Sequence, residues 1–154
     1  LKGFEHFSPK RIILDKKLEI RLDSYIFKSA KKDNTIIFHN SSNNLKINLL
    51  KNKRIKLIKL KLDKYDHFDL KMILKKLYTL GIRNLLVEGG DKMTKNFLRY
   101  RLANRFFLFK SPKNLSKSKK HLFFTSLSIL NEKYSVKSKT TTKLAKDNIT
   151  IYKR

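Results

Sequence analysis

The sequence lacks cysteine, a long apolar run and an initiator methionine, and it has few acidic residues. Without cysteine the chain has no disulfide, no thiolate zinc site and no cysteine nucleophile. No apolar stretch approaches the roughly 18 to 20 residues of a membrane span, and the N-terminus has no apolar core of a signal peptide. These absences predict a soluble, cytoplasmic protein without a membrane partner. Because the first residue is Leu1, we expect residues that are missing from the sequence to precede it.

The remaining composition is that of a globular protein. The chain has 154 residues, of which 40% are hydrophobic and 11% aromatic, so it can bury a core. This length fits one domain better than two. We therefore predict a single domain over residues 1–154.

Positive charge dominates the surface. Lys and Arg number 38 against 12 for Asp and Glu, a formal net charge of +26, which favours anionic partners. Lys and Asn recur along the whole chain, as in 40–44 and 51–54, which is typical of an AT-rich coding sequence. A nucleic-acid stripe should instead concentrate charge on one face between aromatic residues. We therefore expect no specific nucleic-acid partner; a sequence-independent nucleic-acid-binding protein stays open as an alternative.

Hydrophobic periodicity predicts an α/β fold. Apolar runs predict strands at 11–15, 35–39, 55–62, 84–88 and 105–109, with an antiparallel pair at 134–142 and 148–152. Helical spacing predicts helices over 69–80 and 91–101, whereas 24–28, 44–50 and 122–130 are ambiguous. The alternation indicates a mostly parallel central sheet flanked by helices, with an antiparallel C-terminal hairpin.

One segment combines features of a phosphate site. The run 84–88 is expected as a buried strand that ends at Glu88, and Gly89-Gly90 then turns the chain into a helix. Free N–H groups and the positive dipole end of such a helix favour phosphate. Lys92, Thr94 and Lys95 would add contacts. The alternative is an ordinary strand-to-helix turn with Glu88 in solvent.

Other chemistry has little support. The four histidines, His6, His39, His67 and His121, show no spacing typical of metal ligands, so we predict no metal site. The Ser and Thr residues of 138–142 form a β-type run with no base beside them, so nucleophilic catalysis has no support, and the catalytic residues stay unknown.

The segments 11–15, 80–90, 97–106 and 111–112 together resemble the reductase domain of the bifunctional riboflavin-biosynthesis deaminase/reductase. The resemblance covers most of residues 9–112 and implies a dihydrofolate-reductase-like fold. It implies reduction of 5-amino-6-(5-phosphoribosylamino)uracil, a phosphorylated pyrimidine, to the ribitylamino product with NADPH. Glu88 would bind substrate. The implied cofactor-binding residues form one continuous run: Gly89, Gly90, Asp91, Lys92, Met93, Thr94, Lys95 and Asn96.

The sequence also departs from that family. Asn104-Arg105 replaces an acidic pair, Lys16 replaces a small hydroxyl residue, and 113–119 replaces a glycine-rich loop. The first reductase strand would precede Leu1, and the zinc deaminase domain is not in this chain, so the expected domain is N-terminally truncated. A reductase-like domain without activity is therefore a further alternative. Relatives commonly form homodimers, and the sequence does not fix the oligomeric state.

Overall fold

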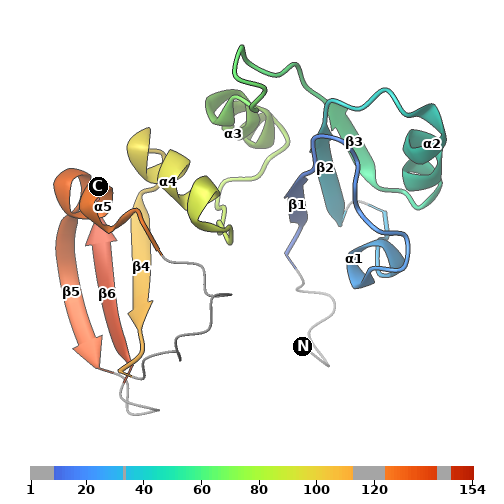
Figure 1. The fold of residues 1–154 in the computed structure, drawn as a ribbon. Coiled ribbons are helices and arrows are strands. Elements are labelled where there is room, and N and C mark those ends of the chain that lie inside the picture. The colour runs from blue at the N-terminus through green and yellow to red at the C-terminus, as the bar shows by residue number, and fades with distance from the viewer. Residues whose placement is uncertain (1–8, 33, 113–123, 142–146) are drawn as a thin grey trace, which may run out of the picture. The chain divides into compact units, whose positions relative to one another are not determined.

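The computed structural model describes residues 9–32, 34–112, 124–141 and 147–154 (Figure 1). The chain divides into two compact units, unit 1 over Leu1–Asp69 and unit 2 over Leu70–Arg154. Both units combine helices with a β-sheet, which confirms the α/β class. Within the described ranges, no helix is long and apolar enough to cross a membrane.

Unit 1 contains a three-stranded parallel sheet and two helices. Its elements are β1 (Arg11–Leu14), α1 (Tyr25–Lys28), β2 (Thr35–His39), α2 (Asn44–Asn52) and β3 (Lys56–Lys59). The strand order is β1-β2-β3, with Ile36 opposite both Ile12 and Lys56. The predicted strands are confirmed, and the ambiguous segments 24–28 and 44–50 contain helices.

The central strand β2 is the most buried element of unit 1. All five of its residues are buried, whereas β1 at the sheet edge is only half-buried. On one face of the sheet, Ile37 packs with Leu18, Leu50 and Ile55, and Phe27 adds to this core. Helices α1 and α2 therefore cover this face (Figure 1). A strand with neighbours on both sides reads as a continuous apolar run, as the sequence of β2 does.

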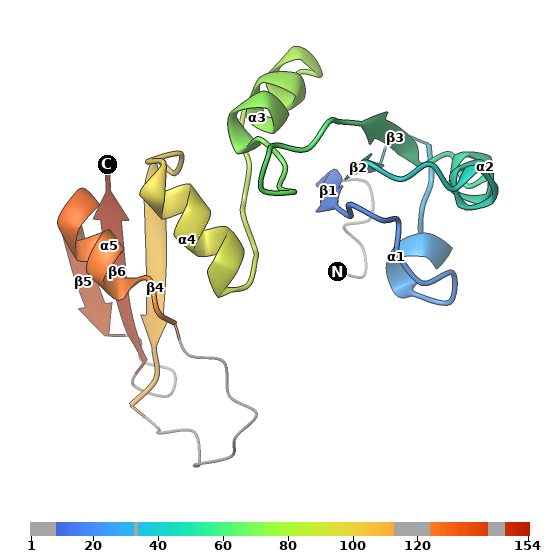
Figure 2. The ribbon, with the colours of Figure 1, turned by 45° about the horizontal axis from the view of Figure 1, so that its top comes forward.

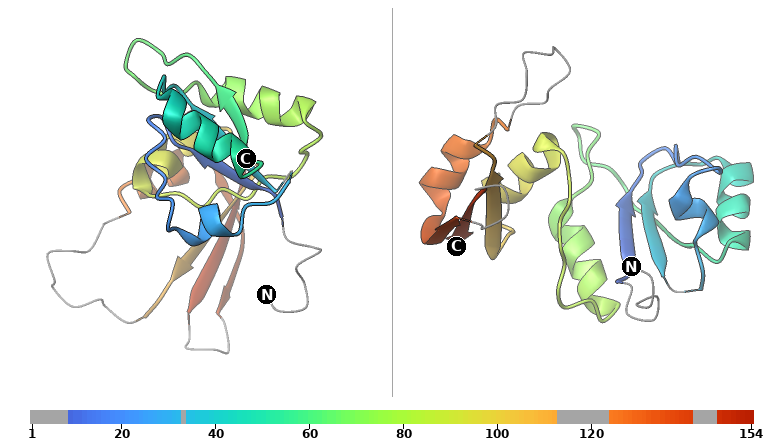
Figure 3. Two further views of the ribbon diagram at one scale, coloured as in Figure 1. Left: turned by 90° about the vertical axis from the view of Figure 1, so that its right-hand side faces the viewer. Right: turned by 90° about the horizontal axis from the view of Figure 1, so that it is seen from below.

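Unit 2 contains a helix pair packed on an antiparallel sheet. Its elements are α3 (Leu70–Thr79), α4 (Asp91–Arg99), β4 (Arg105–Lys110), α5 (Leu127–Lys133), β5 (Ser135–Thr141) and β6 (Asn148–Lys153). The strand order is β4-β6-β5, and the three strands lie side by side in Figure 3. The predicted antiparallel pair is confirmed, and its second strand also pairs with β4. Helix α5 lies in the segment that the sequence left unassigned.

Helices α4 and α5 cover one face of this antiparallel sheet (Figure 2). Leu98 from α4 and Leu130 from α5 are fully buried and form a core with Tyr134 and Tyr152. Phe106 packs edge-on against Tyr152, with their ring centroids 6.5 Å apart. Alternation of side chains along β4 explains why Phe106 is half-buried while its neighbour Phe107 is exposed.

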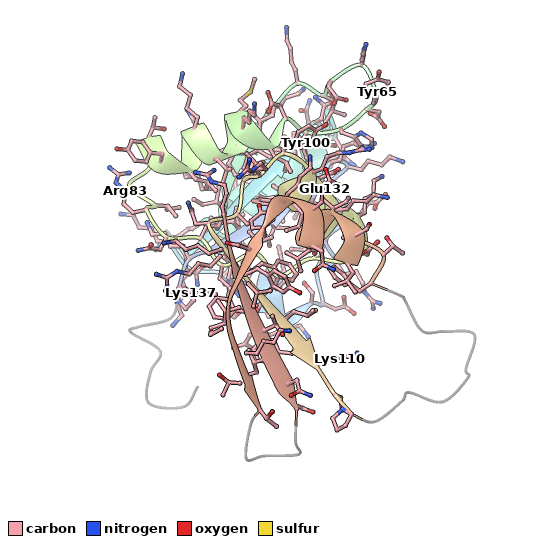
Figure 4. All side chains as sticks on the ribbon, turned by 90° about the vertical axis from the view of Figure 1, so that its left-hand side faces the viewer. Tyr65, Arg83, Tyr100, Lys110, Glu132 and Lys137 are labelled. Carbon is pink, nitrogen blue, oxygen red and sulfur yellow. The ribbon has the colours of Figure 1, made fainter. Side chains whose placement is uncertain are left out.

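Helix α3 ends in a C-terminal capping motif centred on Gly81. The N–H of Gly81 donates to the Tyr78 carbonyl, the N–H of Ile82 donates to the Leu77 carbonyl, and Gly81 has φ of +81°. Such a left-handed residue after a helix is most easily glycine. The Arg83 guanidinium then lies 3.9 Å from the ring centroid of Tyr78 (Figure 4). The predicted helix end at Gly81 is confirmed.

The predicted buried strand at 84–88 is wrong. Residues 82–90 form neither strand nor helix, and Leu86 is 79% exposed. A β-strand needs a neighbouring backbone to take its hydrogen bonds, and no described strand pairs with this segment. The apolar run alone therefore does not form a strand in this structure.

A buried histidine ends the central strand of unit 1. His39 is 3% exposed, and its Nδ1 has no hydrogen-bond partner among the described residues. Burial lowers the pKa of His39, and the positive charge of Lys59 lowers it further. The Ser41 backbone and the charge of Asp15 oppose these two effects in part. The net effect favours the neutral form of the imidazole.

We expect unit 1 to lose stability as the pH falls below about 6.5, the ordinary pKa of histidine. Below this pH the unfolded chain binds a proton at His39 more tightly than the folded chain does. Protonation therefore stabilises the unfolded state relative to the folded state. The variant His39→Leu should remove this part of the pH dependence of the denaturation midpoint between pH 7.5 and 5. The exposed-residue control His67→Gln should keep it. Parallel curves for wild type and His39→Leu would contradict this account.

Candidate functional site

The candidate site begins where the extended segment turns into α4. Gly90 is the N-cap residue and Asp91 the first helical residue, as the glycine turn and the helical spacing predicted. The strand that was expected to carry Glu88 is absent, so only the helical half of the predicted arrangement is present. All eight residues predicted to bind the cofactor lie in this turn and the first two turns of α4.

The first turn of α4 presents backbone donors. The N–H groups of Met93 and Thr94 both donate to the Gly90 carbonyl, at 3.0 and 3.1 Å. The N–H groups of Asp91 and Lys92 have no partner in the described part of the chain. Helix starts leave such donors free and carry a partial positive charge, which together favour a phosphate group.

Two cations extend this donor set. Lys92 and Lys95 are exposed and stand three residues apart on α4, so they share one side of the helix. A side chain added at Gly90 would meet no atom within 4 Å, so the space in front of the helix start is open. The arrangement therefore offers amide donors and two ammonium groups to an anion.

The two glycines have different roles. A Cβ atom on Gly89 would lie 2.8 Å from Cβ of Met93 and 2.9 Å from its Cγ, closer than real side chains approach. The sequence assigns both glycines to the turn into the helix. The structure shows that Gly89 is required by the close packing of α4 itself, whereas Gly90 borders open space.

Asp91 ties the start of α4 to the start of α5. Its carboxylate accepts hydrogen bonds from the N–H and the hydroxyl of Thr125 and from the hydroxyl of Ser126. The Thr125 hydroxyl contributes most to a lowered pKa of Asp91. Sequence reasoning missed Thr125 and Ser126, because they lie more than 30 residues from Asp91 and no local pattern connects them.

Glu88 is exposed, and its carboxylate contacts no hydrogen-bond donor in the described ranges. It is therefore free to accept hydrogen bonds from a bound molecule. Within those ranges, no group of three or more His, Asp or Glu side chains is placed to hold a metal ion.

Solved structures place this fold in a class. The chain is similar to a pyrimidine reductase-like protein from Corynebacterium diphtheriae, with 16% identity, a TM-score of 0.69, and coverage of 94% of this chain and 60% of that one. It is also similar to one crystal form of Acinetobacter baumannii RibD, with 17% identity, a TM-score of 0.70, and coverage of 99% and 40%. At these identities the likeness shows a pyrimidine-reductase-like fold and no more.

The sequence comparison is more specific. The family described as the RibD C-terminal domain matches residues 2–150, and the chain belongs to this family. The riboflavin biosynthesis protein RibD of Aquifex aeolicus is 32% identical over 148 residues. That alignment covers 95% of this chain and 39% of the relative, so the chain spans about two fifths of the relative's length. The resemblance inferred from the sequence is confirmed.

We expect Gly89→Ala and Gly90→Ala to differ in stability. The new methyl group at position 89 collides with Met93, and such overpacking costs about 1–3 kcal/mol. At position 90 the methyl group meets no atom. The loss in unfolding free energy should therefore stay below about 1 kcal/mol, which is the cost of replacing glycine by alanine, a weaker N-cap residue. Chemical denaturation of both variants checks this, and equal losses would contradict the assigned role of Gly89.

Proposed function

We propose that this chain catalyses the reduction step of riboflavin biosynthesis. In this reaction the ribose of 5-amino-6-(5-phosphoribosylamino)uracil is reduced to a ribityl chain with NADPH. Membership in the RibD C-terminal domain family supports the reaction class. The observation that carries the assignment to this site is the start of α4, with its free amides and two lysines.

Both molecules in this reaction carry phosphate, and the site has groups that suit phosphate. NADPH supplies the hydride when it is bound. The amides of Asp91 and Lys92 would hold a cofactor phosphate, with the ammonium groups of Lys92 and Lys95 beside it. Because the Asp91 carboxylate is occupied by Thr125 and Ser126, these hydrogen bonds offset part of its repulsion of a phosphate.

Glu88 suits the substrate better than the cofactor. A carboxylate repels cofactor phosphates, but it accepts hydrogen bonds from ribose hydroxyl or pyrimidine amine groups. In the structure it makes no bond to the N–H groups of the glycine turn, so it does not act there as a structural acid. We therefore assign Glu88 to substrate binding.

We expect Glu88→Gln to lower the single-turnover rate of substrate reduction and to leave the melting temperature unchanged. Losing a hydrogen bond to a charged group costs about 1.5–3 kcal/mol, which is roughly 10- to 150-fold in rate. NADPH affinity should stay as in wild type. The control Glu132→Gln changes an exposed glutamate on α5 (Figure 4) and should alter neither quantity. A destabilised Glu88→Gln with normal turnover per folded molecule would overturn the assignment.

We expect the protein to bind NADPH more tightly than NADH, because Lys92 and Lys95 attract the additional phosphate. The double variant Lys92→Gln/Lys95→Gln should lose this preference, by up to about fivefold per lysine, the range of exposed ion pairs. Fluorescence titration with both cofactors measures the effect. The control Lys137→Gln/Lys139→Gln removes the same charge from β5 and should keep the preference. Equal affinities of the wild type for the two cofactors would contradict the proposal.

Three further expectations stay predictions. These are a single reductase domain over 1–154, a cytoplasmic location, and a homodimer as in relatives of the family. An inactive reductase-like domain is distinguished by the absence of turnover in the wild-type protein. A sequence-independent nucleic-acid-binding protein stays open as the alternative, and duplex affinity that persists at physiological salt would support it.

A further inference from the structure

Unit 1 has a concave surface on which cations form most of the lining. The cavity has a volume of about 460 Å³. Its lining comes from two segments, one before β2 and one before β3: Ala30, Lys31, Lys32, Asn52, Lys53 and Arg54. Four of these six residues carry a positive charge, and no acid belongs to the described lining. Asp33 lies outside the described residues.

The parallel sheet places these two segments side by side. Strands β2 and β3 are hydrogen-bonded neighbours that run in the same direction, so the residues before them meet at the amino-terminal edge of the sheet. His39 lies at the opposite, carboxyl-terminal edge of the same sheet. The cationic concavity is therefore separate from that edge, where open α/β sheets usually bind their ligands.

The loop before β2 is fixed by side-chain hydrogen bonds. The Asn34 amide accepts from the Lys31 N–H at 3.0 Å and donates to the Ser29 carbonyl at 3.1 Å. Arg11 from the neighbouring strand donates to both the hydroxyl and the carbonyl of Ser29. These bonds anchor the backbone of Ser29 and Lys31 beside the sheet.

The turn before β3 is equally well defined. The Lys53 ammonium lies 5.5 Å from the centroid of the Phe27 ring, a distance at which a cation and an aromatic face attract. Arg54 adopts the left-handed backbone region with φ of +58°, and its N–H donates to the Lys51 carbonyl at 2.7 Å. The cationic groups of this turn therefore start from a fixed backbone.

The helix end explains only part of this charge. Cations near a helix C-terminus are favourable, which accounts for Lys53 after α2. It does not account for Lys31 and Lys32, which come from the other loop. Four like charges around one concavity repel one another, and an anion with several charges would relieve this repulsion.

We propose that this concavity binds a small molecule with several phosphate groups, such as a triphosphate chain. Its volume lies within the roughly 300–1,000 Å³ of small-molecule sites. Lys and Arg are the side chains that recognise phosphate, through ammonium point charges and the guanidinium fork. Its residues belong to unit 1, whereas α4 of the proposed reductase site belongs to unit 2.

The test is titration of the full chain with inorganic tripolyphosphate, followed by backbone amide NMR shifts and by calorimetry at 0.15 M salt. We expect saturable shifts in residues 30–32 and 52–54. Shifts confined to residues 90–96 would place the anion at α4 and overturn this proposal without affecting the proposed reductase function.

Two double variants and one matched control separate a built site from general charge. Lys53→Gln/Arg54→Asn removes two cations, and asparagine tolerates the left-handed backbone of position 54. We expect it to weaken tripolyphosphate binding about tenfold. The control Lys75→Gln/Lys76→Gln removes the same charge from the exposed side of α3 and should leave the affinity unchanged. Lys31→Gln/Lys32→Gln, on the other wall, should repeat the loss. Equal weakening by all three variants, or no saturation in wild type, would overturn the proposal.

Discussion

Backbone pairing of parallel strands is the constraint on which unit 1 depends. Because β1, β2 and β3 all run in one direction, every segment that enters the sheet lies at one edge and every segment that leaves it lies at the other. The four cations of the concavity meet at the entering edge, and the buried His39 lies at the leaving edge. The cationic concavity and His39 thus lie at opposite ends of the same parallel strands.

Local patterns predicted the elements that depend on local interactions. The apolar spacing and Gly81 identified α3 and its end, because the helix and its glycine motif bond only within the segment. The glycine pair likewise identified the start of α4. The run 84–88 failed for the opposite reason: a strand depends on a distant partner, and five apolar residues do not specify one.

The candidate site was predictable to the same extent. The helix start and its free amide donors follow from the turn sequence, since such donors are a local property. The collision that explains Gly89 involves the packing of Met93, which no spacing rule describes. The bonds of Asp91 to Thr125 and the cationic concavity join segments that are distant in the sequence, so only the folded chain reveals them.

The bond between Asp91 and Thr125 also concerns the evolution of chain length. Two anchors bracket the connection between β4 and α5: the pairing of β4 with β6 before it, and the Asp91 carboxylate after it. The starts of α4 and α5 are therefore joined through the Asp91 carboxylate, and a change of chain length elsewhere that keeps Asp91, Thr125 and Ser126 keeps this connection.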